Sequence, residues 1–261
     1  MKSFNFKSAS NTKEATKLAS GRATFLAGGM SLLPALKLRL AAYSDLINIK
    51  KIKVLSGIKV SSKSIRIGAT TTHAEVASSK EVGKSIPSLA VLADGIGDPQ
   101  VRNRGTIGGS IANNDPAADY PSACLALNAI IHTSKRKIAA DKFFKGMFET
   151  DLKKGELIES VEFEVPEKSG YAKFPNPASR YAVVGVYVSK LKSGVRVAVT
   201  GAANSVFRSK ELEEALSSNF STSSIDNAKI GSKGLNSDIH ASAEYRAHII
   251  KVMAKKAVSS C

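Results

Sequence analysis

The sequence of 261 residues contains no tryptophan, only two cysteines and few aromatic residues. The cysteines, Cys124 and Cys261, lie far apart and match no metal-ligand spacing, so the sequence predicts no metal site. Cys124 falls in a run rich in Ala and Leu, which is typical of a small buried apolar residue. An iron–sulfur cluster of the usual kind needs four cysteine ligands, so two cysteines exclude a cluster held by this chain alone.

Long apolar runs are also missing. No run approaches the roughly 20 residues that a helix needs to cross a bilayer. The first seven residues have a basic start with no apolar core behind it, so the sequence predicts neither a signal peptide nor a transmembrane segment. We therefore expect a cytoplasmic protein. Its length suffices for one large domain or two ordinary ones, each with its own core.

Acidic residues are few: the chain has 22 Asp and Glu but 38 Lys and Arg, which gives a formal net charge of +16. A charge of this size is typical of proteins that bind nucleic acid. The lysines, however, are scattered in pairs such as Lys50-Lys51 and Lys255-Lys256, without interleaved aromatic residues. Solvated lysine faces, or attraction to an acidic ligand or partner subunit, explain the charge more simply. We predict no nucleic-acid partner.

The most distinctive stretch of the chain spans residues 95–119. Glycines crowd residues 95–110, and Asp115 and Asp119 follow. Glycine permits positive φ and close approach of a ligand, and successive amides of a turn can converge on an anion. A phosphate contact followed by an acidic contact to ribose hydroxyls is typical of a nucleotide site. This stretch alone leaves a purely structural glycine-rich loop equally open.

A second glycine turn lies about 80 residues earlier, in residues 24–40. The pattern predicts a strand, a turn at Gly28-Gly29 and a helix, with Ser31 as a suitable N-cap and Pro34 in the first turn. A glycine pair beside a serine offers amides and a hydroxyl to a phosphate. Neither a Walker loop nor the Gly-x-Gly-x-x-Gly dinucleotide fingerprint is present, so this turn by itself does not identify a ligand.

The rest of the chain alternates between strand and helix signals up to about residue 167. Thr72 and Glu75 have the spacing of a capping box, which predicts a helix beginning at Thr72. His73 has no second ligand at metal spacing and is interpreted as structural. Beyond residue 170, strands at residues 181–188 and 195–200 precede helices at residues 210–216 and 241–258. This order favours a separate α+β domain.

The two glycine segments together resemble the FAD-binding motifs of the medium subunit of molybdenum hydroxylases. This family includes aerobic carbon monoxide dehydrogenase and the xanthine dehydrogenase relatives. Residues 27–34, Ala-Gly-Gly-Met-Ser-Leu-Leu-Pro, resemble the first motif, and residues 98–110 resemble the second nearly letter for letter. Residues 68–75 and 238–246 match further family segments, so the likeness spans nearly the whole chain. The segment before Phe25 is shorter than is usual in the family.

The resemblance implies an α+β fold in two domains. Residues 1–167 would form a two-subdomain FAD-binding domain of the vanillyl-alcohol oxidase or PCMH type, and residues 168–261 a small α+β domain of the carbon monoxide dehydrogenase flavoprotein type. FAD would be bound without a covalent link, and no catalytic side chain is expected. The cofactor-binding residues carried over from the family are Ala27, Gly28, Gly29, Met30, Ser31, Leu33, Thr106, Ile107, Gly108, Gly109, Ser110, Asp115, Asp119, Ile158, Lys173 and Tyr181.

The same resemblance implies roles for individual residues. The two glycine motifs would hold the pyrophosphate of FAD. Asp119 would bind the adenosine ribose, with Asp115 beside it. Ile158, Lys173 and Tyr181 would lie near the isoalloxazine.

As a function, the resemblance implies the electron-transfer subunit of a heterotrimeric molybdenum hydroxylase. Its partners would be a large molybdopterin-binding subunit and a small [2Fe–2S] subunit, in a dimer of heterotrimers. Electrons would pass from the iron–sulfur clusters through FAD to an external acceptor, because the cofactor carries the chemistry and the protein positions it. Two alternatives remain open: a self-sufficient FAD-dependent oxidase, and a non-enzymatic basic nucleotide-binding module. Substrate and acceptor are not encoded in this chain.

Overall fold

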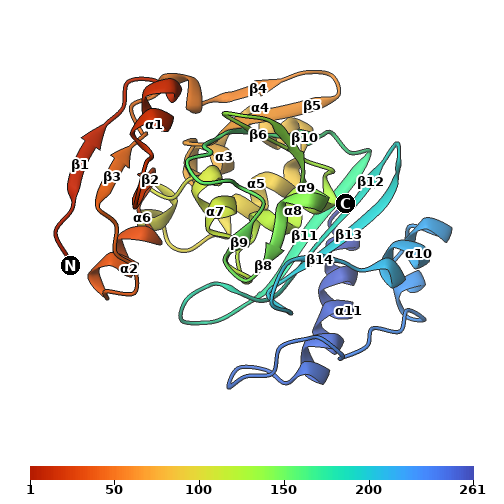
Figure 1. Cartoon of the computed structure of the whole chain (residues 1–261). Helices are drawn as coiled ribbons and strands as arrows, with labels where there is room; N and C mark the ends of the chain where they lie inside the picture. Colours follow the sequence, from red (N-terminus) through yellow and green to blue (C-terminus); the bar gives the residue numbers. More distant parts are fainter.

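The N-terminal unit is a three-stranded parallel sheet with strand order β1-β3-β2. We describe it from a computed structural model, which covers residues 1–261 (Figure 1). Asn11 caps the first helix by accepting a hydrogen bond from the Glu14 amide, and Ile47 on the central strand is fully buried. The elements of this unit are β1 (Asn5–Ser8), α1 (Thr12–Leu18), β2 (Ala23–Leu26), α2 (Leu32–Lys37), β3 (Asp45–Asn48) and the 3-10 turn η1 (Lys53–Leu55).

The central unit is a five-stranded antiparallel sheet with the order β4-β5-β10-β6-β7. Ile65 and Ile67 of β5 and Val161 and Phe163 of β10 are fully buried, because alternate residues of each strand face the main core. The strands are β4 (Ile58–Val60), β5 (Ser64–Gly68), β6 (Ile130–Thr133), β7 (Lys137–Ala139) and β10 (Ile158–Glu164), and a two-stranded ribbon adds β8 (Phe144–Gly146) and β9 (Glu149–Thr150).

Seven short helices accompany the central sheet. Thr72 and Glu75 form the predicted capping box at the start of α3, with both reciprocal hydrogen bonds present. Ile86 precedes α5, and Pro87 occupies its first position, where a missing amide costs nothing. The helices are α3 (His73–Ser78), α4 (Lys80–Ser85), α5 (Pro87–Asp94), α6 (Pro99–Arg102), α7 (Ile107–Asn113), α8 (Tyr120–Ala126) and α9 (Ala140–Phe143).

The C-terminal unit is a four-stranded antiparallel sheet with the order β11-β12-β13-β14. Helix α11 packs on β11 and β12, where the absent side chain of Gly170 leaves room for the Ala257 carbonyl. The opposite face of the sheet contacts α8, and Tyr187 joins the main core there. The elements are β11 (Lys168–Pro175), β12 (Ala182–Leu191), β13 (Gly194–Thr200), β14 (Phe207–Arg208), α10 (Lys210–Ser218), η2 (Ser223–Ile225) and α11 (Ala243–Ser259).

Two local predictions were wrong. Ser31 precedes α2 in a helical conformation and makes no side-chain capping bond, and the helix ends at Lys37 rather than continuing through Leu40. Leu40 is 79% exposed, because the chain leaves the helix before that residue could pack. The glycine-rich stretch is also more regular than predicted. Thr106 accepts a hydrogen bond from the Gly109 amide at 3.1 Å and starts helix α7, so the motif glycines lie in a helical turn rather than in a loop.

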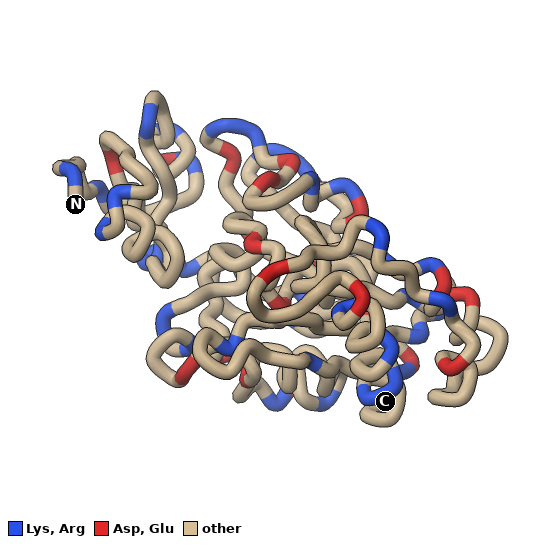
Figure 2. The backbone as a smooth tube through the Cα atoms, turned by 90° about the horizontal axis from the view of Figure 1, so that it is seen from below, with Lys and Arg blue, Asp and Glu red and all other residues tan.

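The positive charge is unevenly distributed along the chain. Residues 1–56, which form the N-terminal unit, hold ten Lys and Arg but only Glu14 and Asp45 as acidic residues (Figure 2). Of these two, Asp45 pairs with Lys7 at 2.7 Å. The N-terminal unit is therefore a strongly basic part of the molecule.

Candidate FAD site

A cavity of about 890 Å³ lies between the N-terminal unit and the central unit. One wall comes from β2 and the turn before α2, and another from the start of α7. Residues from the segments 40–49, 69–73, 96–101, 112–119, 148–158 and 179–181 also line the cavity. The volume falls in the range of about 300–1,000 Å³ that is typical of small-molecule and cofactor sites.

The two glycine segments contact each other in this cavity. A Cβ on Gly28 would lie 2.0 Å from the carbonyl oxygen of Arg104, so only glycine lets the β2–α2 turn rest on the backbone before the second motif. Gly29 has a φ of +80°, in the left-handed region that other residues rarely adopt. The segments are about 80 residues apart in sequence, and their backbones meet because Gly28 has no side chain at the contact.

The turn before α2, which lines the cavity, contains backbone amides without a protein acceptor. The amides of residues 28–31 donate to no protein acceptor, although Gly28 and Gly29 are buried. Buried backbone donors are almost always paired, so the free amides of the buried Gly28 and Gly29 at the cavity wall indicate an external acceptor. Converging amides of this kind suit an anion such as a pyrophosphate. The donor set therefore fits the pyrophosphate of FAD.

The second glycine motif contributes differently from the prediction that its amides would converge on an anion. The Ile107 amide donates to the Thr71 carbonyl at 3.1 Å, and the Gly108 amide donates to the Ala69 carbonyl at 2.9 Å. The Gly109 amide is used by Thr106. These amides are therefore occupied by the protein itself, because they anchor α7 to the end of β5.

In the second motif, Gly109 is the residue that leaves free space for a ligand beside the backbone. A Cβ on Gly108 would lie 2.5 Å from the Cβ of Ala69, so Gly108 is required for packing. A Cβ on Gly109 would meet only the Thr106 hydroxyl oxygen, at 2.9 Å, and would otherwise project into free space. Gly109 is exposed and lines the cavity, so a ligand can approach the helix backbone closely at this position.

The structure brings most of the candidate residues together. Three do not line the cavity: Leu33 packs under Gly29, Ile107 is buried in the main core, and Lys173 lies behind Asp119. The lining candidates are Ala27, Gly28, Gly29, Met30, Ser31, Thr106, Gly108, Gly109, Ser110, Asp115, Asp119, Ile158 and Tyr181.

Asp119 is already engaged by two side chains of the protein. Its Oδ1 accepts a hydrogen bond from the Tyr171 hydroxyl and lies 2.9 Å from the Lys173 Nζ. The side chains of Asp119 and Lys173 are only 5% and 9% exposed. Burial raises the pKa of the Asp119 carboxyl, and the Lys173 ammonium opposes that shift. Burial raises the pKa of Tyr171 well above its ordinary value, and the charge of Asp119 is the second cause of that rise. The Tyr171 hydroxyl therefore stays protonated and donates.

The cavity also contains residues that sequence reasoning missed. Phe148 has a φ of +55° and Arg180 a φ of +62°, both unusual for residues other than glycine. His73, interpreted as structural, is 5% exposed, and its Nδ1 has no hydrogen-bond partner. Burial and then Arg102 lower the pKa of His73 to about 4, so the ring is neutral near pH 7. No spacing in the sequence indicates that these side chains border one cavity.

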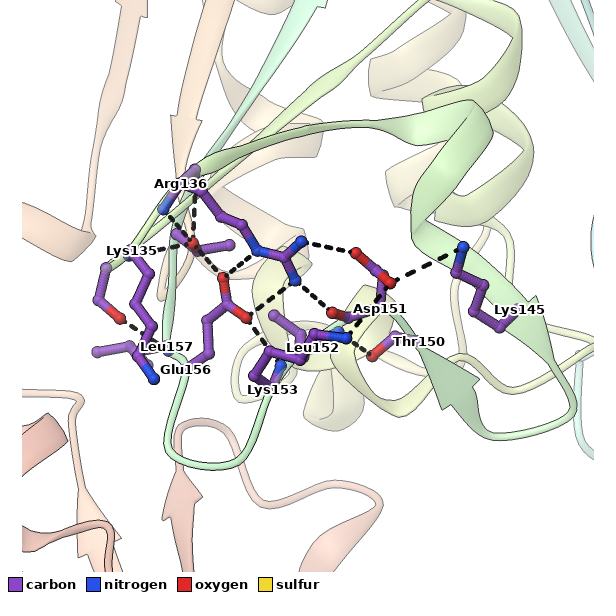
Figure 3. Close-up of polar contacts among 11 residues, drawn as sticks. Lys135, Arg136, Lys145, Thr150, Asp151, Leu152, Lys153, Glu156 and Leu157 are labelled. Carbon is purple, nitrogen blue, oxygen red and sulfur yellow. Dashed lines mark hydrogen bonds and ion pairs between the residues drawn. The ribbon is translucent and has the colours of Figure 1, made fainter.

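Glu156 stabilises the loop at residues 151–157, three residues of which line the cavity. Figure 3 shows its polar contacts. Its carboxylate accepts hydrogen bonds from Arg136 Nε at 3.1 Å, the Thr133 hydroxyl at 2.7 Å and the Lys153 amide at 2.8 Å. Arg136 Nη1 also donates to Asp151 at 2.9 Å. Burial alone raises the pKa of Glu156, but these donors outweigh it and lower the pKa to about 2. The ion pairs thus hold residues 151–157 in place.

Comparisons with known proteins decide the family. The model of the FAD-binding domain in molybdopterin dehydrogenase matches residues 2–167. The chain belongs to this family. It is 36% identical to the glyceraldehyde dehydrogenase medium chain of Sulfolobus acidocaldarius, over 97% of this chain and 96% of that protein. It is 35% identical to the nicotine 6-hydroxylase medium subunit of Paenarthrobacter nicotinovorans, over 89% and 87%.

Solved structures of the family have the same fold. Carbon monoxide dehydrogenase from Hydrogenophaga pseudoflava, in a form that lacks the Mo-pyranopterin moiety, matches with a TM-score of 0.90 at 33% identity, covering 99% of this chain and 96% of that one. The chain is thus an FAD-binding subunit of the molybdenum hydroxylase family, whose members are oxidoreductase subunits. The mixed helix and sheet fold implied by the resemblance is confirmed. None of the helices is long and apolar enough to cross a membrane.

Proposed function

We propose that this chain carries electrons through a non-covalently bound FAD within a heterotrimeric molybdenum hydroxylase. The observation that carries the proposal is the set of amides at residues 28–31 that donate to no protein group, in a turn that lines the same cavity as Gly109. FAD, when bound, supplies the redox chemistry, since it can accept and release electrons while the protein positions it. Family membership supports this cofactor over other anionic ligands.

The chain's own residues bind and orient the cofactor. The amides of residues 28–31 hold the pyrophosphate, and Gly109 lets it approach α7. Asp115 and Asp119 border the region assigned to the ribose, and Ile158 and Tyr181 border the region assigned to the isoalloxazine. Tyr181 is 44% exposed, which leaves that end of the cavity accessible to a partner protein.

Relatives named as medium chains or subunits support a multi-subunit assembly. The partners we propose are a large molybdopterin-binding subunit and a small [2Fe–2S] subunit, in a cytoplasmic dimer of heterotrimers. The relatives' names refer to glyceraldehyde, nicotine and carbon monoxide, so we place substrate choice on the large subunit. The FAD-binding domain would comprise residues 1–167 and the C-terminal domain residues 168–261, a boundary that coincides with the start of β11.

The flavin content of the purified protein tests this proposal. We expect one FAD per chain in the complex purified with its partner subunits, released by denaturation and identified as FAD rather than FMN. A basic nucleotide-binding module without redox function would show no flavin absorption even at saturating FAD. A self-sufficient oxidase would contain flavin and turn over an organic substrate without any partner subunit.

A further inference from the structure

The backbone carbonyls of residues 95–97, which we call the carbonyl turn, lie directly after α5. Carbonyl groups at the end of a helix carry partial negative charge and favour cations. The Arg102 Nη1 donates to the carbonyls of Ile96 at 3.2 Å and Gly97 at 3.1 Å. Arg102 is 17% exposed, and its Nε lies 3.5 Å from Asp94. The Arg102 guanidinium therefore holds two of the three carbonyls of the turn by hydrogen bonds.

Two further cations bind the same turn from the C-terminal half of the chain. Lys173 donates to the Gly95 carbonyl at 2.8 Å while its Nζ pairs with Asp119. Arg180 donates to the Gly97 carbonyl at 3.1 Å. The carbonyl turn thus supplies acceptors to two cationic side chains of the candidate site that are far from it in sequence.

Arg102 itself lies outside the cavity, whereas Ile96, Gly97 and Arg180 line it. We propose that Arg102 is a positioning residue for the FAD site, which acts by fixing the carbonyl turn and, through it, Lys173 and Arg180. This inference rests on the proposed function. Lysine has a flexible four-carbon stem, so its acceptors determine where the ammonium lies. If the turn shifts, Lys173 loses the Gly95 carbonyl and the charge beside Asp119 moves.

A double-mutant cycle, measured on the complex with the partner subunits, tests whether Arg102 acts on FAD binding through Lys173. We expect Arg102→Met to raise the Kd for FAD about tenfold, the scale of one hydrogen bond made by a charged group. In a Lys173→Met background the same change should raise it only about threefold, because one of the two residues through which Arg102 acts is gone while Arg180 remains. Lys84→Met is the matched control, since the exposed Lys84 side chain on α4 lies outside the cavity and makes no hydrogen bond or ion pair; it should leave the Kd unchanged.

Hydrogen exchange on the chain without FAD gives an independent readout. Arg102→Met should speed exchange in peptides covering residues 94–98 and 172–181, and leave the five-stranded sheet protected. The positioning role would be overturned if Arg102→Met raised the Kd for FAD equally in the unmutated and Lys173→Met backgrounds. It would also be overturned if exchange at residues 172–181 did not change. Either result would leave FAD binding by the unmutated chain standing. Failure of the unmutated complex to bind FAD would instead overturn the proposed function, and the exchange result would still decide whether Arg102 controls residues 172–181.

Discussion

Single residues explain why two glycine motifs form one site. Gly28 and Gly108 are required by contacts within the protein, whereas Gly109 is open toward the cavity. The sequence predicted the importance of all three, because the motifs are specific to the family. It could not separate them, because the atom that a Cβ would meet depends on chain segments far away in sequence.

The first prediction concerns Gly109. Gly109→Val should abolish FAD retention in a chain that still folds, because the valine side chain occupies ligand space and the protein atom within 4 Å of its Cβ is the Thr106 hydroxyl, which must shift slightly. Flavin content after gel filtration and the Tm of the chain measure the two effects. Gly83→Val, in α4 with no atom near its added Cβ, is the control and should retain FAD. Stoichiometric FAD in a folded Gly109→Val protein would refute the assignment.

The second prediction concerns Asp119. Asp119→Ala should lower the free energy of unfolding by about 3–5 kcal/mol, because it leaves the buried Lys173 ammonium without its counter-charge. Urea unfolding of the chain without FAD measures the change. The double variant Asp119→Asn/Lys173→Met should recover much of the loss, since neither residue then carries an unpaired charge. If Asp119→Ala weakened FAD binding yet left unfolding unchanged, Asp119 would act as a ligand-binding residue rather than as part of a buried ion pair.

At the scale of elements, local signals predicted best. The capping box at Thr72 correctly gave the start of α3, and the strand predicted at residues 195–200 lies within β13. Helix α7 was missed because glycine is a poor helix former, and only the distant backbone acceptors at Ala69 and Thr71 make this helix favourable. The ion pairs of the loop at residues 151–157 were not predicted, since they join segments about 20 residues apart.

The third prediction concerns that loop. Glu156→Gln should lower the free energy of unfolding at neutral pH by about 1–3 kcal/mol, because it removes the charge that pairs with Arg136. The pKa of Glu156 is lowered from 4.5 to about 2 in the folded chain, so its contribution is complete above about pH 4.5 and is lost as the pH falls toward 2.

Denaturant unfolding of both proteins between pH 7 and pH 2 measures this contribution. The difference between the unmutated chain and Glu156→Gln should shrink steadily below pH 4.5. Glu149→Gln is the control, because its exposed side chain makes no ion pair. A difference that stayed constant down to pH 2 would show that the carboxylate charge of Glu156 does not stabilise the loop.

At the scale of the whole molecule, the cavity belongs to no single unit, because its walls come from the N-terminal unit, the central unit and residues 179–181. The sequence predicted both motifs but not that their backbones touch. The order of strands and helices beyond residue 170 indicated a separate C-terminal domain, and the resemblance supplied the boundary at residue 167. The sequence shows that residues 1–56 are poor in acidic residues, but it did not predict that they fold together as one basic unit.

The fourth prediction follows from the shared cavity. FAD should stabilise the chain as a whole, by about 2.7 kcal/mol at a concentration 100 times the Kd. For a chain of this size that corresponds to a rise in Tm of roughly 5–10 °C. Differential scanning calorimetry with FAD, FMN and no flavin measures it, and FMN should stabilise less because it lacks the adenosine half. Equal stabilisation by FMN would place the adenosine outside the cavity.

The central claim is that this chain passes electrons that another subunit delivers. The most direct measurement is the anaerobic absorbance of the FAD-loaded chain in the flavin bands, recorded first with purine, aldehyde and carbon monoxide in turn and then with the chemically reduced [2Fe–2S] subunit. We predict no bleaching by any of the three substrates and prompt bleaching by the reduced subunit. Bleaching by a substrate without any partner, or no bleaching by the reduced subunit, would contradict the account.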